Sequence, residues 1–245
     1  MNQCLPDFHV IFKAAVKENL TSGRPKNGMF IAVPTNIKEN IIDVSPISWR
    51  IQAAILVTNG AKLLLINSYF PTDPKTVNFD DSELIETLAT INHVIDNNTF
   101  DQIFWGGDIN ADFFRKTSFV STVNDQISDM NLKKCWDHFY ADFTHTFEVN
   151  NVMHVSIIDH FFWNEDMHKH IEDAGVLHLV DNTSDHCPIY CVVNISGLKS
   201  RTTDSVHKNN KPSWKKASDE QKTVWFSNLQ NKLSGLNKPE SMINC

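Results

Sequence analysis

The 245-residue sequence has no apolar run of eighteen residues, which excludes an ordinary transmembrane helix. Its first residues lack the basic-then-apolar order of a signal peptide. We therefore expect a soluble intracellular protein with no membrane partner, in either the nucleus or the cytoplasm. The five scattered cysteines include no C-x-x-C pair, which argues against a disulfide framework and predicts free thiols. No internal repeat is evident, so a repeat architecture is not expected.

The main part of the chain also lacks an excess of positive charge. Residues 1–196 carry 13 Lys+Arg against 25 Asp+Glu, a net charge of −12, whereas residues 197–245 carry 9 against 4, a net charge of +5. An acidic body is a poor non-specific binder of polyanions, because duplex binding normally draws on clustered Lys and Arg. Bound divalent cations could offset this charge locally.

Strand-like and helix-like stretches alternate along the chain. Asn59-Gly60 stands between two apolar runs and predicts a β-hairpin over residues 51–70. Apolar residues at helical spacing predict a helix over 80–97, with Asp80 and Glu83 placed as a capping box. Further strands are expected at 8–14, 29–33, 102–105, 144–147, 157–163 and 187–193, and a second helix around 120–130. This order predicts a layered α/β or α+β sandwich rather than a doubly wound Rossmann sheet.

The composition changes near residue 197. Residues 197–212 are rich in Lys, Ser, Thr and Asn, which is typical of a linker. Apolar residues then form one stripe of a predicted helix over 214–236. We expect a main domain over residues 1–196, a linker over 197–212 and a C-terminal helical connector over 213–245.

Three polar clusters each lie at the edge of an apolar strand. After Phe104-Trp105, the paired glycines Gly106-Gly107 would let the backbone turn, and in an extended segment Asp108 and Asn110 would point to one side. There they could converge on a phosphate, a water or a metal. Asp159 and Asp185-His186 add carboxylates and an imidazole at other strand ends. Taken singly, each cluster also fits a solvated turn or a strand-end polar residue.

The order of these clusters resembles the endonuclease/exonuclease/phosphatase superfamily, and within it the apurinic-type endonuclease domains of non-LTR retrotransposons. The resemblance covers roughly residues 7–196 and implies a four-layer α/β/β/α sandwich of the DNase I-like type. It also implies divalent-metal-dependent hydrolysis of phosphodiester bonds in DNA, with Mg²⁺ or Mn²⁺ as the cofactor. The matching motifs are Asn67-Ser68-Tyr69-x-Pro71, Gly106-Gly107-Asp108-x-Asn110, Ile158-Asp159-His160-Phe161 and Ser184-Asp185-His186-x-Pro188.

The resemblance implies a role for each matched residue. Asp108 would activate or orient the attacking water, and Asn110 would hold a phosphate oxygen. His186 would stabilise the charge that develops on the phosphoryl group, and Asp159 would hydrogen-bond His186 and fix its tautomer. Tyr69 would contact the scissile phosphate.

The implied metal ligands are Asp185, Asp108 and Asn110. In the superfamily a Gln-Glu pair on an early strand supplies the principal metal carboxylate, and no matching position exists here. We therefore expect a domain without about the first two strands of the family's sandwich. Two consequences are expected, namely weak metal binding and an exposed sheet edge through which copies of the chain could associate.

Two other functions fit the same motifs. One is a catalytically inactive, retroelement-derived remnant that binds nucleic acid or protein. The other is a phosphatase of the same fold that acts on a small phosphate ester, which the acidic body would favour.

Two further groups of residues could bind metal or pack in the core. His168, His170 and His178 lack the spacing of a known zinc motif and are interpreted as surface histidines. Cys187 and Cys191 are expected to share one strand face as buried thiols.

Overall fold

The structure is a computed structural model of the chain, and it describes residues 5–14, 28–73, 81–139, 145–148, 155–179 and 182–200. Residues Met1–Ser200 form one compact unit. The predicted helix over 214–236 and most of the predicted linker lie outside the described residues. No helix in the described part of the chain has the length and apolar character needed to cross a bilayer.

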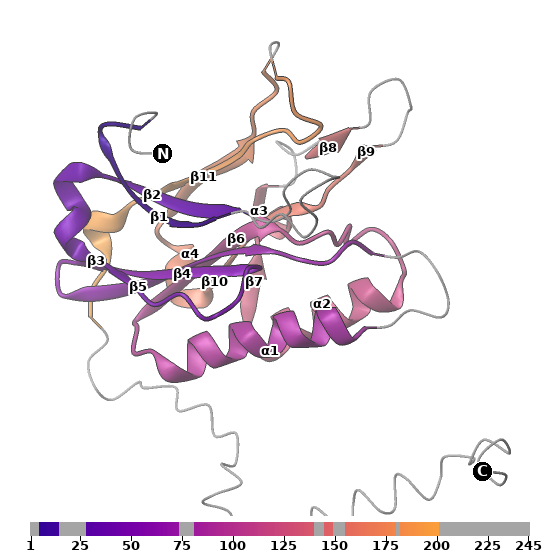
Figure 1. Cartoon of the computed structure of the whole chain (residues 1–245), viewed down its shortest axis with the longest axis horizontal. Coiled ribbons are helices and arrows are strands. Elements are labelled where there is room, and N and C mark those ends of the chain that lie inside the picture. The colour runs from indigo at the N-terminus through magenta and orange to yellow at the C-terminus, as the bar shows by residue number, and fades with distance from the viewer. Residues whose placement is uncertain are drawn as a thin grey trace, which may run out of the picture. The chain divides into compact units, whose positions relative to one another are not determined.

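A six-stranded mixed sheet forms the centre of this unit (Figure 1). The predicted hairpin is confirmed as β4 and β5, with positive φ angles at both Asn59 and Gly60. β5 pairs with β6 in parallel, and the other pairs are antiparallel. In spatial order the strands are β3 (Ile41–Asp43), β4 (Ile51–Thr58), β5 (Ala61–Tyr69), β6 (Gln102–Asp108), β10 (Asp159–Asn164) and β7 (Leu132–Lys134).

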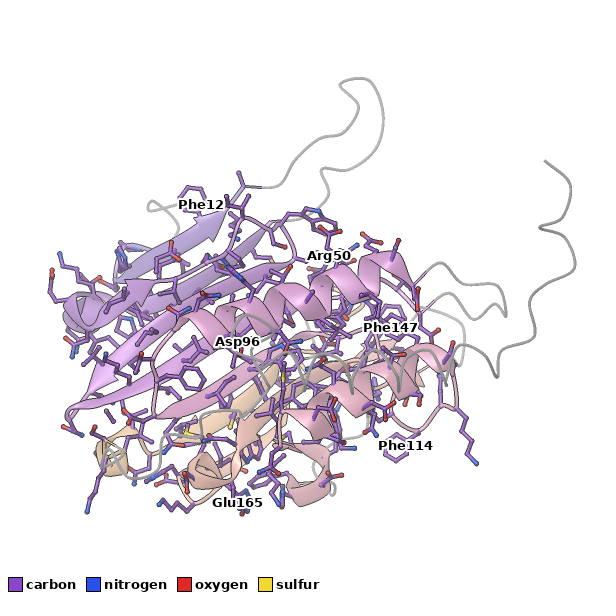
Figure 2. All side chains as sticks on the ribbon, turned by 90° about the horizontal axis from the view of Figure 1, so that it is seen from below. Phe12, Arg50, Asp96, Phe114, Phe147 and Glu165 are labelled. Carbon is purple, nitrogen blue, oxygen red and sulfur yellow. The ribbon has the colours of Figure 1, made fainter. Side chains whose placement is uncertain are left out.

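Two helices, α1 (Ser82–Asn97) and α2 (Ser118–Asp129), lie on one side of the sheet (Figure 1). Both were predicted from their apolar spacing, and their buried residues form one core with alternate residues of the strands. Asp80 of the expected capping box lies outside the described residues, and its expected partner Glu83 accepts hydrogen bonds from Arg50 (labelled in Figure 2) near the start of α1. Thr117 caps α2 by accepting a bond from the Val120 amide.

Two separate two-stranded sheets lie on the opposite side of the central sheet (Figure 1). One is formed by β1 (Phe8–Lys13) and β2 (Met29–Pro34), and the other by β11 (Ile171–Val176) and β12 (Ile189–Val193). A groove of about 340 Å³ is lined by residues of β2 and β12, with β5, β6 and β10 as its floor. This arrangement confirms the predicted layered sandwich of mixed α and β elements.

Several short elements were not predicted, because two to six residues are too few for hydrophobic periodicity to show. The predicted strand at 144–147 is reduced to Phe147–Glu148, and the last strand begins at Ile189 rather than at Cys187. The unpredicted elements are η1 (Thr35–Asn40), β3, β7, α3 (Trp136–Phe139), β9 (Val155–Ser156), α4 (Glu165–His168), β11 and η3 (Ile195–Gly197), whereas β8 (Phe147–Glu148) overlaps the predicted strand at 144–147.

Candidate active site

Three of the predicted site residues lie in one row at the edge of the central sheet. Tyr69 ends β5 and is in register with Asp108, which ends β6. Asp159 begins β10 and is paired with Asp108 on the other side. A hydrogen bond of 2.8 Å from the Ile109 amide to the Ile158 carbonyl continues this pairing beyond the strand end. The sheet register therefore places two carboxylates side by side.

The paired glycines serve close packing rather than a turn. Gly106 and Gly107 both lie within β6, and the expected sharp bend at these residues is absent. Gly107 has a φ of +143°, and a Cβ there would lie 2.0 Å from the Ser68 carbonyl oxygen. A Cβ on Gly106 would lie 2.7 Å from the ring of Phe161. Both positions thus require glycine because neighbouring strands approach closely.

The chain bends instead at Asn110, which has a φ of +52°. This left-handed conformation is tolerated by asparagine more readily than by most residues. The Asn110 amide donates to Asp108 Oδ1 at 3.0 Å, and its side-chain Nδ2 donates to the Phe70 carbonyl at 3.0 Å. Asp108 and Asn110 are therefore joined by an Asx-type turn and do not project in parallel from an extended strand.

His186 reaches both carboxylates of the row. Its Nδ1 lies 2.9 Å from Asp159 Oδ2, and its Nε2 lies 4.0 Å from Asp108 Oδ2. The backbone holds this histidine from two sides, since its amide donates to Ser184 Oγ and its carbonyl accepts from Asn182. The structure thus brings together Asp108, Asp159 and His186, from three distant parts of the chain.

The charges of this cluster depend on one another. Burial, followed by the neighbouring charge of Asp159, raises the pKa of Asp108 to about 6. The hydrogen bond that His186 donates to Asp159 raises the pKa of His186 despite its partial burial. The two carboxylates therefore favour the protonated imidazole, and Asp108 itself titrates near pH 6.

Asp185 and Tyr69 lie farther out than the other predicted residues. Asp185 is exposed, and its donor oxygens are not among the three groups whose ligand atoms converge. Its backbone carbonyl accepts a bond from the Glu148 amide at 2.9 Å. The Tyr69 ring is 40% exposed beside Trp49, and Arg50 donates to its carbonyl.

Thr146 is a part of the site that sequence reasoning missed. This residue is completely buried, and its hydroxyl oxygen accepts the amides of Ile158 at 3.0 Å and Asp159 at 3.1 Å. Its carbonyl accepts the Cys187 amide at 2.7 Å. Thr146 thus fixes the segments that carry Asp159 and His186. The Thr-His-Thr-Phe stretch was interpreted only as a strand, and a buried threonine has no sequence pattern of its own.

The donor set at the strand ends suits a hard divalent cation. Donor atoms of Asp108, Asp159 and His186 all lie within 4.8 Å of one another. Asp159 Oδ2 and His186 Nδ1 are hydrogen-bonded to each other and Asp108 Oδ1 accepts the Asn110 amide, so Asp108 Oδ2 is the remaining carboxylate oxygen near the group. Such cations prefer oxygen ligands and keep several waters when protein ligands are few.

Comparisons with solved structures find close likenesses in fold at low sequence identity. The endonuclease domain of TRAS1, a telomere-specific non-LTR retrotransposon, is 17% identical, with a TM-score of 0.55 over 78% of this chain and 80% of that one. An AP endonuclease from Archaeoglobus fulgidus is 14% identical, with a TM-score of 0.56 over 78% and 81%. TDP2 of D. rerio, in complex with a single-strand DNA product, is 14% identical, with a TM-score of 0.55 over 79% of each chain. No protein-family model matches the sequence, and no curated protein matches it significantly.

Proposed function

We propose that this chain, which has the DNase I-like fold of the endonuclease/exonuclease/phosphatase superfamily, hydrolyses phosphodiester bonds in DNA with the help of a divalent cation. The observation that carries the proposal is the convergence of Asp108, Asp159 and His186 at the strand ends of that fold. The neighbours described above include endonucleases and a protein bound to a DNA product, which supports DNA as the substrate.

Each residue of the cluster has a task in such a reaction. Asp108, with its pKa near 6, accepts a proton from the water that attacks phosphorus in line with the leaving oxygen. The His186 Nε2, on the ring edge turned toward Asp108, donates to a non-bridging oxygen as negative charge grows there. Asp159 holds His186 in the tautomer and charge state that this needs.

The remaining residues bind phosphate and the cation. Asn110 keeps its Oδ1 as an acceptor or metal ligand while its Nδ2 is held by Phe70, and the exposed Tyr69 contacts the scissile phosphate. A Mg²⁺ or Mn²⁺ ion held by Asp108 and Asn110, with Asp185 at the rim, would supply positive charge to the phosphoryl oxygens. The small number of protein oxygens favours weak binding of this ion.

Nicking of supercoiled plasmid by the purified full chain tests the proposal. We expect Mg²⁺- or Mn²⁺-dependent nicking that is abolished by a chelator and reduced at least about 100-fold in Asp108→Ala and His186→Ala. Asp96→Ala is the matched control, because Asp96 is an exposed acid on α1 (Figure 2). Nicking that is equal in the wild type and in His186→Ala would overturn the proposal. Faster turnover of a soluble phosphomonoester than of plasmid would favour a phosphatase instead.

Self-association through an open sheet edge is a separate part of the proposal. Within the described residues, β2 pairs with β1 alone and β12 pairs with β11 alone, so each presents an edge toward the groove. Light scattering coupled to gel filtration would give the mass of the particle in solution. A monomer at all concentrations would contradict this part without affecting the nuclease proposal.

A further inference from the structure

A second group of metal-binding side chains lies next to the candidate active site. Ligand atoms of His145, His178 and Cys187 are all within 4.8 Å of one another. Glu148 lies beside this group, since its Oε2 is 3.4 Å from His145 Nε2, but it is not one of the three residues whose ligand atoms converge. Cys187 directly follows His186 in the sequence, so this group adjoins the catalytic cluster without sharing a residue with it.

The structure corrects one expectation about these residues and adds one contact. His178 is exposed, as expected of a surface histidine, and its ring lies against His145, with ring centroids 4.9 Å apart. Cys187 and Cys191 are not two fully buried thiols, since both are only partly buried. Cys187 lies before β12 and its sulfur is 3.7 Å from His178 Nδ1. The chain therefore brings one cysteine and two histidines together, with Glu148 beside His145.

Backbone hydrogen bonds hold the three segments that supply these donors. The Cys187 amide donates to the Thr146 carbonyl at 2.7 Å, and the Glu148 amide donates to the Asp185 carbonyl at 2.9 Å. The Leu177 amide donates to the Pro188 carbonyl at 2.7 Å, which fixes the backbone just before His178. The donor atoms are thus gathered by the fold itself, so little ordering is needed for an ion to bind.

The distances between donors agree with the geometry of zinc. Zinc bonds of about 2.3 Å to sulfur and about 2.0–2.2 Å to nitrogen and oxygen place tetrahedral ligand atoms about 3.3–3.6 Å apart. The Cys187 sulfur to His178 nitrogen distance of 3.7 Å is close to such an edge, and the His145 ligand atom lies within 4.8 Å of both. Thiolate and imidazole ligands also favour zinc over Mg²⁺ or Ca²⁺.

We propose that His145, His178 and Cys187 bind one zinc ion at a site that positions the segment carrying His186. One water completes the tetrahedral coordination sphere, and Glu148 is the carboxylate partner that orients the His145 imidazole, an arrangement common around zinc. Because Cys187 adjoins His186, a fixed sulfur restrains the imidazole relative to Asp159. The ion required for hydrolysis and this ion would then occupy separate sites with different ligand preferences.

Titration of the metal-stripped full chain with Co²⁺ tests the site directly. We expect one Co²⁺ per chain with the visible bands of a tetrahedral ion and a near-ultraviolet thiolate-to-cobalt band, both displaced by one equivalent of Zn²⁺. Cys187→Ser should abolish the thiolate band, and His178→Ala should weaken binding by at least about tenfold. The absence of a thiolate band in the wild type, or its persistence in Cys187→Ser, would overturn the proposal.

Two controls separate this site from the others in the chain. Cys191→Ser removes a thiol of the same strand region and should leave the cobalt spectrum unchanged. Asp108→Asn should also keep the spectrum, because the catalytic cluster contains no sulfur, so a failure of the nuclease proposal would not affect this result. Zn²⁺ should raise the melting temperature of the wild type and not of Cys187→Ser. An unchanged wild-type melting temperature would contradict the structural role.

Discussion

At the scale of single residues, Asp159 contributes to the raised pKa of both other members of the cluster, His186 and Asp108. Its hydrogen bond raises the pKa of His186, and its charge contributes to the raised pKa of Asp108. The proposed reaction needs ionised Asp108 and protonated His186, so activity should rise with pH through about 6 and fall above the pKa of His186.

Asp159→Asn should therefore shift both limbs of the pH–rate profile to lower pH, because it removes the charge that raises the pKa of both Asp108 and His186. The remaining activity should be lower at every pH, because the amide does not stabilise the imidazolium. Plasmid nicking measured across the pH range at saturating Mg²⁺ gives both limbs. If the falling limb stays in place while the rate drops, Asp159 does not set the charge of His186.

Thr146 is the residue whose loss should disturb the site without touching substrate. Thr146→Val removes the oxygen that accepts two buried amides, which should lower the free energy of unfolding by about 1–3 kcal/mol. Thr146→Ser keeps the oxygen and should recover most of this. Thr122→Val, at a half-buried position on α2 where the hydroxyl donates to the Ser118 carbonyl in a solvent-exposed hydrogen bond, should change stability by less than about 0.5 kcal/mol. Urea denaturation of the four proteins makes the comparison, and equal stability of Thr146→Val and wild type would contradict it.

At the scale of elements, the approach of β5 to β6 depends on Gly107. Gly60 and Gly107 both have positive φ, but a Cβ at Gly60 meets nothing within 4 Å, whereas a Cβ at Gly107 meets the Ser68 backbone. Gly60→Ala should cost about 1–2 kcal/mol for its backbone conformation alone. Gly107→Ala should cost more than about 3 kcal/mol, because the strands must also separate. Similar urea midpoints for the two variants would show that the close approach carries little energy.

The elements that sequence reasoning predicted are those with a long or local signal. The hairpin at Asn59-Gly60 and the helices α1 and α2 follow from turn chemistry and from apolar spacing over three or more turns. The resemblance of the motifs to the superfamily is confirmed at the level of the fold by the structural neighbours. The role of Gly106-Gly107 was misjudged, because a close approach between strands depends on a partner that is distant in sequence.

The same distinction applies to the candidate site, where some residues could be placed from local sequence signals and others could not. Asp108 and Asp159 could be placed at strand ends from the apolar runs beside them, and the structure pairs them across β6 and β10. The bonds of Thr146 and the grouping of His145 with His178 and Cys187 could not be predicted. Both depend on how separate loops meet in space, and no periodic sequence pattern indicates such contacts.

At the scale of the whole molecule, buried His160 links the central sheet to the segments on either side of it. Its Nε2 donates to the Ala111 carbonyl at 2.7 Å, and its Nδ1 accepts from the Trp136 indole. Burial lowers the pKa of His160 to about 3. Below pH 6.5 the unfolded chain binds a proton that the folded chain does not, so stability should fall as the pH falls from about 6.5 toward about 3.

This single proton predicts a loss of about 1.4 kcal/mol per pH unit over that range. His160→Gln keeps a donor and an acceptor and should remove this part of the acid sensitivity, while lowering stability at neutral pH through imperfect packing. Urea denaturation at about pH 5 and about pH 7 gives the difference for each protein. Equal acid sensitivity in the two proteins would show that His160 is not its source.

The separation of the site residues along the chain also bears on the order of folding. Asp108 and Asp159 meet through neighbouring strands of the central sheet, but His186 lies 78 residues after Asp108 and enters from beyond that sheet. Contacts between such distant residues are slow to form, because a long loop must close first. We therefore expect the hairpin and its helices to fold early and the imidazole to arrive late. A refolding chain would then regain its secondary structure before the three residues of the candidate site come together.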